Sequence, residues 1–140
     1  MGDLLEMGQR ARAAARALAV SPVAARNGAL HGLAAALRSE AAGVLQANEL
    51  DLQEARAAGL PEALLDRLAL NPARLEAAAA GAEAVAALPD PLGETFEMRR
   101  LANGLQVGKR RVPIGVLGVI YEARPNVTVD VAALALNSGN

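Results

Sequence analysis

Apolar residues recur at helical spacing through the first ninety positions, which predicts a series of consecutive helices. Asp3 is expected to cap the first of them, over residues 4–18. Ser21 followed by Pro22 places a capping side chain before a proline at the first helical position, so a second helix should run to about residue 38. These helices are expected to form a layer whose apolar stripe packs against another part of the fold.

Three further helices are expected before the chain changes character. Ser39 should cap the third helix and Gly59 should end it, because glycine readily adopts the left-handed conformation that follows a helix. Pro61 is expected to open a short helix, and the pair Asn71-Pro72 should cap and open another. Proline and glycine residues then close the helical region by residue 93.

Beyond residue 93 the sequence becomes richer in charged and β-compatible residues. Asn103-Gly104 is a strong hairpin signal because both positions tolerate positive φ, so residues 95–101 and 105–112 are predicted to pair as antiparallel strands. Five basic side chains lie on these strands: Arg99, Arg100, Lys109, Arg110 and Arg111. Such a hairpin is typically a solvated edge or an arm that adds to another subunit. Nucleic-acid binding is disfavoured because no aromatic residue is expected among these bases for stacking.

The last part of the chain predicts a strand followed by a helix. Residues 114–121, IGVLGVIY, form an apolar run without alternation, which fits a strand buried on both faces. A polar turn follows, and then VDVAALALNS predicts a helix that Asn126 or Thr128 could cap, with Asp130 in its first turn. This order is the front half of a βαβ unit in a parallel sheet.

The predicted fold class is therefore α/β. Its parts are a helical layer over 1–93, a projecting β-hairpin over 94–112 and a strand-turn-helix over 113–140.

Composition narrows the possible functions. A chain of 140 residues has the size of one domain, and 34 Ala with 22 Leu predict a core of small and aliphatic side chains. A net charge of -1 argues against a global basic field for nucleic acid, and the absence of Cys excludes disulfides, thiolate metal sites and a cysteine nucleophile within this sequence. The longest uncharged run, 27–37, is far shorter than a membrane span, and the N-terminus lacks the positive charge of a signal peptide. The protein is expected to be soluble and cytoplasmic.

The candidate site lies in the polar turn, because ligands of open α/β sheets bind beyond the carboxyl ends of the strands. Arg124 can donate two parallel hydrogen bonds to a phosphate or carboxylate, and Asn126 can donate to a developing oxyanion. On spacing alone, a purely structural interpretation is as well supported as this ligand-binding one. In it, Arg124 pairs with Glu122 and Asn126 merely caps the helix. No metal-ligand spacing occurs, and His31 is expected to be a surface or packing residue.

Three segments carry a resemblance to a known family. They are RRVPIGVLGVIYEARPNVTVDVAALALNSGN over 110–140, LQANELDLQEARAAGLPEALLDRLALNPARLEA over 45–77 and ALPDPLG over 87–93. These segments resemble gamma-glutamyl phosphate reductase, also called glutamate-5-semialdehyde dehydrogenase, of the aldehyde dehydrogenase superfamily. The resemblance covers the whole chain and implies the N-terminal portion of a Rossmann-type cofactor domain, without the catalytic domain that carries the nucleophilic Cys. One departure is Asn137, where the family commonly has Lys.

The resemblance implies an enzyme of proline biosynthesis that reduces L-glutamyl 5-phosphate with NADPH to L-glutamate 5-semialdehyde and phosphate. In the superfamily the strand end and turn lie against the cofactor, which assigns NADP contacts to Ile120, Tyr121, Glu122 and Ala123. The same resemblance gives Arg124 the substrate phosphate or carboxylate and Asn126 the oxyanion. It also implies a homo-oligomer formed through the 94–112 hairpin and a partnership with glutamate 5-kinase. The isolated 140 residues are expected to be inactive.

A second function class stays open beside the enzyme. The chain could be a non-catalytic, Ala-rich helical scaffold or a partner-binding module with an arm. The turn over 121–128 distinguishes the two, because a scaffold has no need for Arg and Asn at the carboxyl end of a strand.

Overall fold

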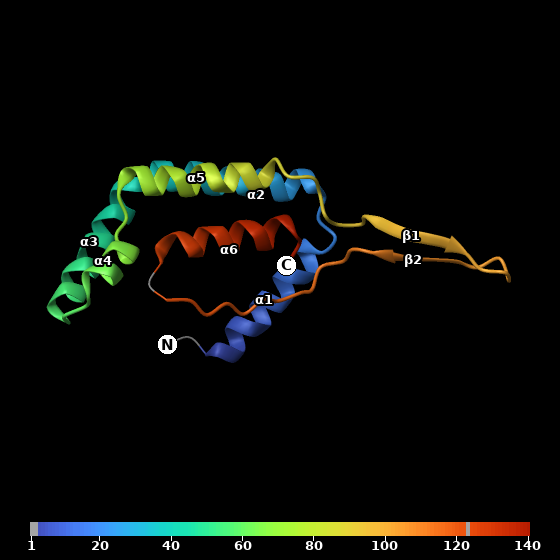
Figure 1. Cartoon of the computed structure of the whole chain (residues 1–140), viewed down its shortest axis with the longest axis horizontal. Coiled ribbons are helices and arrows are strands. Elements are labelled where there is room, and N and C mark those ends of the chain that lie inside the picture. Colours follow the sequence, from blue (N-terminus) through green and yellow to red (C-terminus); the bar gives the residue numbers. More distant parts are fainter. Residues whose placement is uncertain (1–2, 123) are drawn as a thin grey trace.

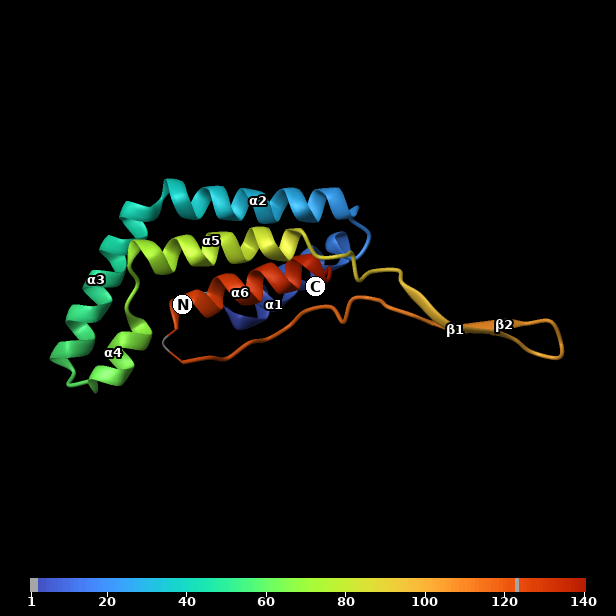
Figure 2. The same ribbon diagram turned by 45° about the horizontal axis from the view of Figure 1, so that its top comes forward.

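A bundle of helices with a projecting hairpin makes up the fold (Figure 1). The computed structural model describes residues 3–122 and 124–140. In chain order, the elements are α1 (Leu4–Leu18), α2 (Val23–Ser39), α3 (Ala41–Ala57), α4 (Glu62–Leu68), α5 (Pro72–Ala86), β1 (Thr95–Arg100), β2 (Gln106–Arg110) and α6 (Pro125–Asn137). Helices α2, α5 and α6 lie side by side in both views, while α3 and α4 form one end and the hairpin extends from the other (Figures 1 and 2).

The core lies between α2, α5 and α6 and is built mainly from alanine. Its fully or almost fully buried members are Leu30, Ala34, Ala79, Ala82, Ala86 and Ala133. Small side chains let helix backbones approach closely, so the alanine-rich sequence allows α2, α5 and α6 to pack tightly against one another. Leu30 is the largest side chain buried completely among the described residues. Within the described ranges, no helix combines the length and apolar character that crossing a membrane requires.

Two of the predicted helix caps are confirmed. The Asp3 carboxylate accepts from the Leu5 amide at 3.0 Å, and the Asn71 side-chain oxygen accepts from the Arg74 amide at 2.8 Å. Each side chain satisfies a backbone donor that the first turn leaves without an intrahelical partner. Gly59, at φ +76°, follows α3 as predicted.

The caps predicted at Ser21 and Ser39 are wrong. The Ser21 hydroxyl donates back to the Leu18 carbonyl at the end of α1, and Pro22 precedes α2 without a side-chain cap. Ser39 is the last residue of α2 and donates to the Ala36 carbonyl, because only Glu40 separates α2 from α3. Both hydroxyls therefore serve the helix that ends rather than the one that begins.

The hairpin is confirmed, and its loop lies between the two predicted strands, although only one of the two turn residues has positive φ. The Leu101 amide donates to the Leu105 carbonyl at 2.8 Å, and the Gly104 amide donates to the Leu101 carbonyl at 2.9 Å. Three residues therefore form the loop, and of the Asn103-Gly104 pair only the glycine has positive φ, at +86°. Asn103 instead accepts the Leu105 amide through its side chain. A bulge between Phe96 and Arg99 interrupts the ladder.

An aromatic ring does lie among the bases of the hairpin, contrary to the prediction. The Arg111 guanidinium lies 5.5 Å and the Lys109 ammonium 5.9 Å from the centre of the Phe96 ring. These cation–π contacts use the ring within its own hairpin. Glu94 and Glu97 also pair with Arg111 and Lys109, so part of the basic charge is balanced locally.

The predicted buried strand over 114–121 is wrong for the described chain. The segment runs past α1 without joining a sheet (Figure 1), and Ile114 and Ile120 are exposed. A parallel strand needs a neighbouring strand, and the only sheet among the described residues is the antiparallel hairpin. The Gly115 amide donates to the Asn140 side chain at 2.8 Å, which ties the start of the segment to the end of α6. The predicted Rossmann-type sheet is thus absent from the described residues, and the helices pack on one another.

A buried ion pair holds the segment that leads into the hairpin. Arg26 on α2 is 3% exposed and donates to the Asp90 carboxylate at 2.5 Å and to the Ser21 carbonyl at 2.6 Å. Asp90 also accepts from the Leu92 amide at 3.0 Å. The start of α2 and the loop after α5 are therefore joined through one guanidinium.

Candidate functional site

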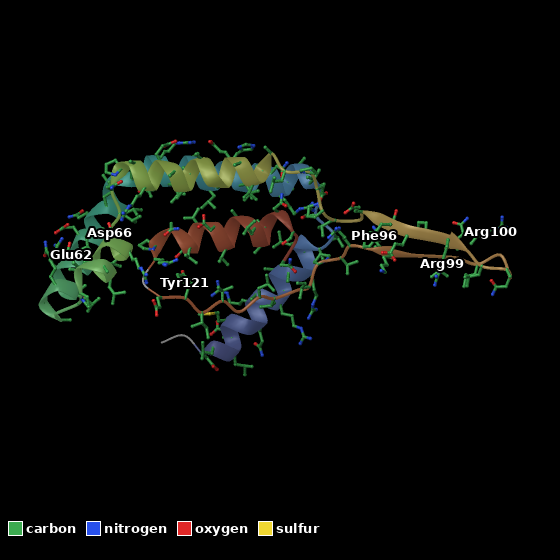
Figure 3. All side chains as sticks on the ribbon, in the orientation of Figure 1. Glu62, Asp66, Phe96, Arg99, Arg100 and Tyr121 are labelled. Carbon is green, nitrogen blue, oxygen red and sulfur yellow. The ribbon has the colours of Figure 1, made fainter. Side chains whose placement is uncertain are left out.

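The polar turn leads directly into α6. Arg124 is the N-cap residue and Pro125 the first residue of the helix. On the two sides of the turn, the Tyr121 hydroxyl and the Thr128 hydroxyl lie 2.5 Å apart, within hydrogen-bond distance. This bond closes the turn around the predicted site, and Figure 3 shows Tyr121 on the segment that approaches α6.

The two residues predicted to bind the reacting substrate both lie at this helix start. Arg124 is exposed, and no ion pair between it and Glu122 occurs among the described residues. Asn126 donates to the Asp130 carboxylate at 3.3 Å. The helix cap predicted at Asn126 or Thr128 is wrong, because Arg124 is the cap residue and Pro125 opens the helix. Asp130, expected in the first turn, lies beyond it.

A pocket of about 420 Å³ opens between α4, α5 and the start of α6. Its charged and amide-bearing lining residues are Asp66, Arg67, Arg74, Arg124, Asn126 and Asp130. The floor is apolar, with Ala77 and Ala78 of α5. The fold thus brings Arg124 and Asn126 together with charged groups from two distant segments (Figure 3 labels Asp66 on α4). A pocket of this size accommodates a small organic ligand.

One pair of these groups is already used within the protein. The Arg74 guanidinium donates to the Asp66 carboxylate at 2.8 Å and to the carbonyls of Asp66 and Ala69 at 2.5 and 2.8 Å. Arg74 therefore fixes α4 against α5, and its charge is balanced by Asp66. The sequence reasoning missed the contribution of α4 because nothing local indicates that this short helix folds back toward the polar turn.

Three of the four residues assigned to the cofactor lie at the end of the extended segment. Ile120, Tyr121 and Glu122 are all exposed, and Ala123 lies outside the described residues. No backbone hydrogen bond found among the described residues involves 116–122, so the amide and carbonyl groups of this stretch are open to a ligand.

Contact of this stretch with a nicotinamide cofactor stays a prediction. The described residues do not provide a Gly-rich turn at a helix start for its phosphates, since Gly115 and Gly118 lie on the extended segment. Nor do the described residues contain a group of three or more His, Asp or Glu side chains that could hold a metal ion.

Comparison with known proteins gives strong sequence matches. The chain matches no protein-family profile. It is 60% identical over 142 residues to "Gamma-glutamyl phosphate reductase" of Roseiflexus castenholzii, a match that covers 100% of this chain and 34% of the relative. The protein of the same name from Deinococcus radiodurans is 59% identical over 135 residues, covering 96% of this chain and 31% of that relative.

Two solved structures share the arrangement of the elements. The crystal structure of gamma-glutamyl phosphate reductase from Thermotoga maritima gives a TM-score of 0.93 at 41% identity and covers 98% of this chain and 33% of that one. The enzyme of the same name from Saccharomyces cerevisiae gives 0.93 at 35% identity, covering 100% of this chain and 36% of that one. This chain spans about a third of the length of the curated relatives that it matches. It is therefore a homologue of the gamma-glutamyl phosphate reductases and corresponds to an N-terminal portion of them.

Proposed function

We propose that residues 1–140 form part of an enzyme that reduces L-glutamyl 5-phosphate with NADPH to L-glutamate 5-semialdehyde and phosphate, a step of proline biosynthesis. The observation that carries this proposal is the pocket in which Arg124 and Asn126 lie together at the start of α6. A charged pocket also favours the enzyme over a helical scaffold, which needs none. The identity to named reductases supports the same reading.

The residues of this chain would bind and orient the acyl phosphate. Arg124 can hold the phosphate through two parallel hydrogen bonds and the positive end of the α6 dipole adds to this attraction. Asn126 keeps one amide hydrogen that its bond to Asp130 does not use, and this hydrogen can donate to a developing oxyanion. NADPH, when bound, supplies the hydride. Residues 120–122 would contact part of that cofactor through their open backbone groups.

The isolated segment of 140 residues is expected to show no reductase activity. The reason is chemical, because an acyl phosphate reductase of this family needs a cysteine nucleophile and this sequence contains none. The measurement is phosphate-dependent reduction of NADP with L-glutamate 5-semialdehyde, the reverse reaction. The control is a full-length reductase whose N-terminal third is residues 1–140, which should be active. Turnover by the 140 residues alone would contradict the proposed mechanism.

We also propose that the 94–112 hairpin joins two subunits. It extends away from the helices (Figure 2) and carries exposed apolar side chains, among them Phe96, Met98 and Leu105. Both outer strand edges are unpaired in the described chain and can add to another strand.

Removal of the hairpin should therefore change the oligomeric state. Replacing residues 95–110 with a short Gly-Ser link in the full-length reductase is expected to lower its mass by light scattering to that of one chain. The exposed pair Arg56–Glu49 on α3 offers a control, since Arg56→Ala should leave the mass unchanged. An unchanged mass after removal of the hairpin would place the subunit contact elsewhere.

A further inference from the structure

Resting on the proposed function, we propose that Arg67 and Asp130 recognise the amino-acid end of the substrate. Arg67 binds the α-carboxylate and Asp130 binds the α-ammonium group, while Arg124 holds the phosphate at the other end. The pocket then selects a ligand that has an anion at each end and an ammonium group beside one of them. Amino-acid acyl phosphates form the substrate class with this pattern.

Three charged groups from two parts of the chain line the same pocket. Arg67 lies on α4, Arg124 precedes α6, and Asp130 lies on α6 beyond its first turn. All three line one pocket of about 420 Å³. A ligand that spans the pocket can therefore meet an arginine at two separate points.

The charged groups of the pocket differ in whether another side chain already balances them. Arg74 and Asp66 neutralise each other and fix α4 to α5, so they contribute shape rather than free charge. The hydrogen bonds and ion pairs found within residues 3–122 and 124–140 do not use the guanidinium of Arg67. Asp130 accepts from Asn126 through one oxygen only, which leaves the other oxygen for an ammonium group.

Beyond the Asp66–Arg74 pair, the pocket offers two cations and one anion, namely Arg67, Arg124 and Asp130. L-glutamyl 5-phosphate presents the complementary set, with a carboxylate, a phosphate and an ammonium group. Complementary charges at these three points favour such a ligand over one that lacks a matching group.

The test separates the contact to the α-carboxylate from the contact to the α-ammonium group by comparing four aldehydes in the reverse reaction. L-glutamate 5-semialdehyde carries both groups, 5-oxopentanoate lacks the ammonium, 4-aminobutanal lacks the carboxylate and butanal lacks both. The assay measures kcat/KM with phosphate and NADP in a full-length reductase whose N-terminal third is residues 1–140. Wild-type enzyme should prefer the semialdehyde over each of the other three.

Arg67→Ala is expected to lower kcat/KM by about 10- to 100-fold for L-glutamate 5-semialdehyde and 5-oxopentanoate, which both carry the carboxylate. This is the range for loss of a charge-assisted contact. The values for 4-aminobutanal and butanal should not change. Arg67→Lys should recover part of the loss, because it keeps the charge and gives up the two parallel bonds. Asp130→Asn should lower kcat/KM for the two amines alone. Arg56→Ala and Asp51→Asn, exposed residues of α3, are the matched controls.

The outcomes separate this inference from the proposed function. If wild-type enzyme does not turn over the semialdehyde, the proposed function fails and this inference fails with it. If wild-type enzyme is active and Arg67→Ala or Asp130→Asn lowers kcat/KM equally for all four aldehydes, the proposed function stands. In that case Arg67 and Asp130 support the shape of the pocket, and recognition of the amino-acid end of the substrate is overturned.

Discussion

Replacing Arg26 with methionine is expected to lower the free energy of unfolding of the chain by about 3 kcal/mol, the lower end of the cost of breaking a buried ion pair. Arg26 is 3% exposed, and its guanidinium is held by the Asp90 carboxylate and the Ser21 carbonyl. Methionine fills much of the same volume, so the lower free energy of unfolding reflects the missing charge rather than a cavity. The remaining Asp90 is partly open to water, which limits the cost of leaving it unpaired.

The measurement is urea denaturation of the 140-residue chain and its variants. The double variant R26M/D90N removes both charges and should regain part of the lost stability, because a neutral pair leaves no unmatched buried charge. Glu49→Gln, at an exposed ion pair on α3, is a control that should change stability by less than about 1 kcal/mol. If R26M unfolds at the same urea concentration as wild type, the ion pair does not hold the start of α2 to the loop after α5.

The pH dependence of stability should follow from the same pair. The Leu92 amide and the Arg26 guanidinium hold the pKa of Asp90 below its ordinary value of 3.8. A carboxyl whose folded-state pKa is lowered stabilises the fold above its unfolded pKa, and this contribution is lost as pH falls through the lower folded-state pKa. Acidification below the ordinary value should therefore cost wild type more stability than it costs D90N.

The parts of the fold that the sequence predicts well depend on short-range contacts. The Asp3 and Asn71 caps need only the next few amides, and Gly59 needs only its own backbone freedom. Ser21 and Ser39 have the same residue type but fail as caps, since each hydroxyl donates to the helix before it. The difference is decided by the bend between two successive helices, which a local pattern does not contain.

The parts that sequence reasoning misses depend on distant neighbours. The run IGVLGVIY has the composition of a buried strand, yet among the described residues no strand lies beside it and its side chains stay exposed. The candidate site shows the same limit. Arg124 and Asn126 are identifiable because they cluster in one turn, whereas Arg67 comes from a short helix that Arg74 of α5 holds beside them. Sequence spacing within α4 carries no sign of that placement.

Replacing Arg124 with alanine is expected to raise KM for L-glutamyl 5-phosphate by about 100-fold, with KM for NADPH changed little. Arg124 lines the pocket between α4, α5 and α6, whereas the open backbone assigned to the cofactor lies on the other side of the turn, over 120–122. Removal of the guanidinium takes away two parallel bonds to the phosphate and leaves the backbone of the turn in place. Steady-state kinetics of the full-length reductase, with each substrate varied in turn, measures the two constants.

The conservative variant Arg124→Lys distinguishes a ligand contact from a structural role. Lysine keeps the positive charge at the α6 start but cannot make the two parallel hydrogen bonds, so it should recover only part of the loss in KM. Arg56→Ala, on the exposed face of α3, removes an arginine that does not line this pocket and is the matched control. A similar rise in KM for both substrates would move Arg124 to the cofactor side of the turn. That result would also change the charge balance of the pocket. Apart from Arg74, which Asp66 balances, Arg67 would then be the one lining cation left for the substrate.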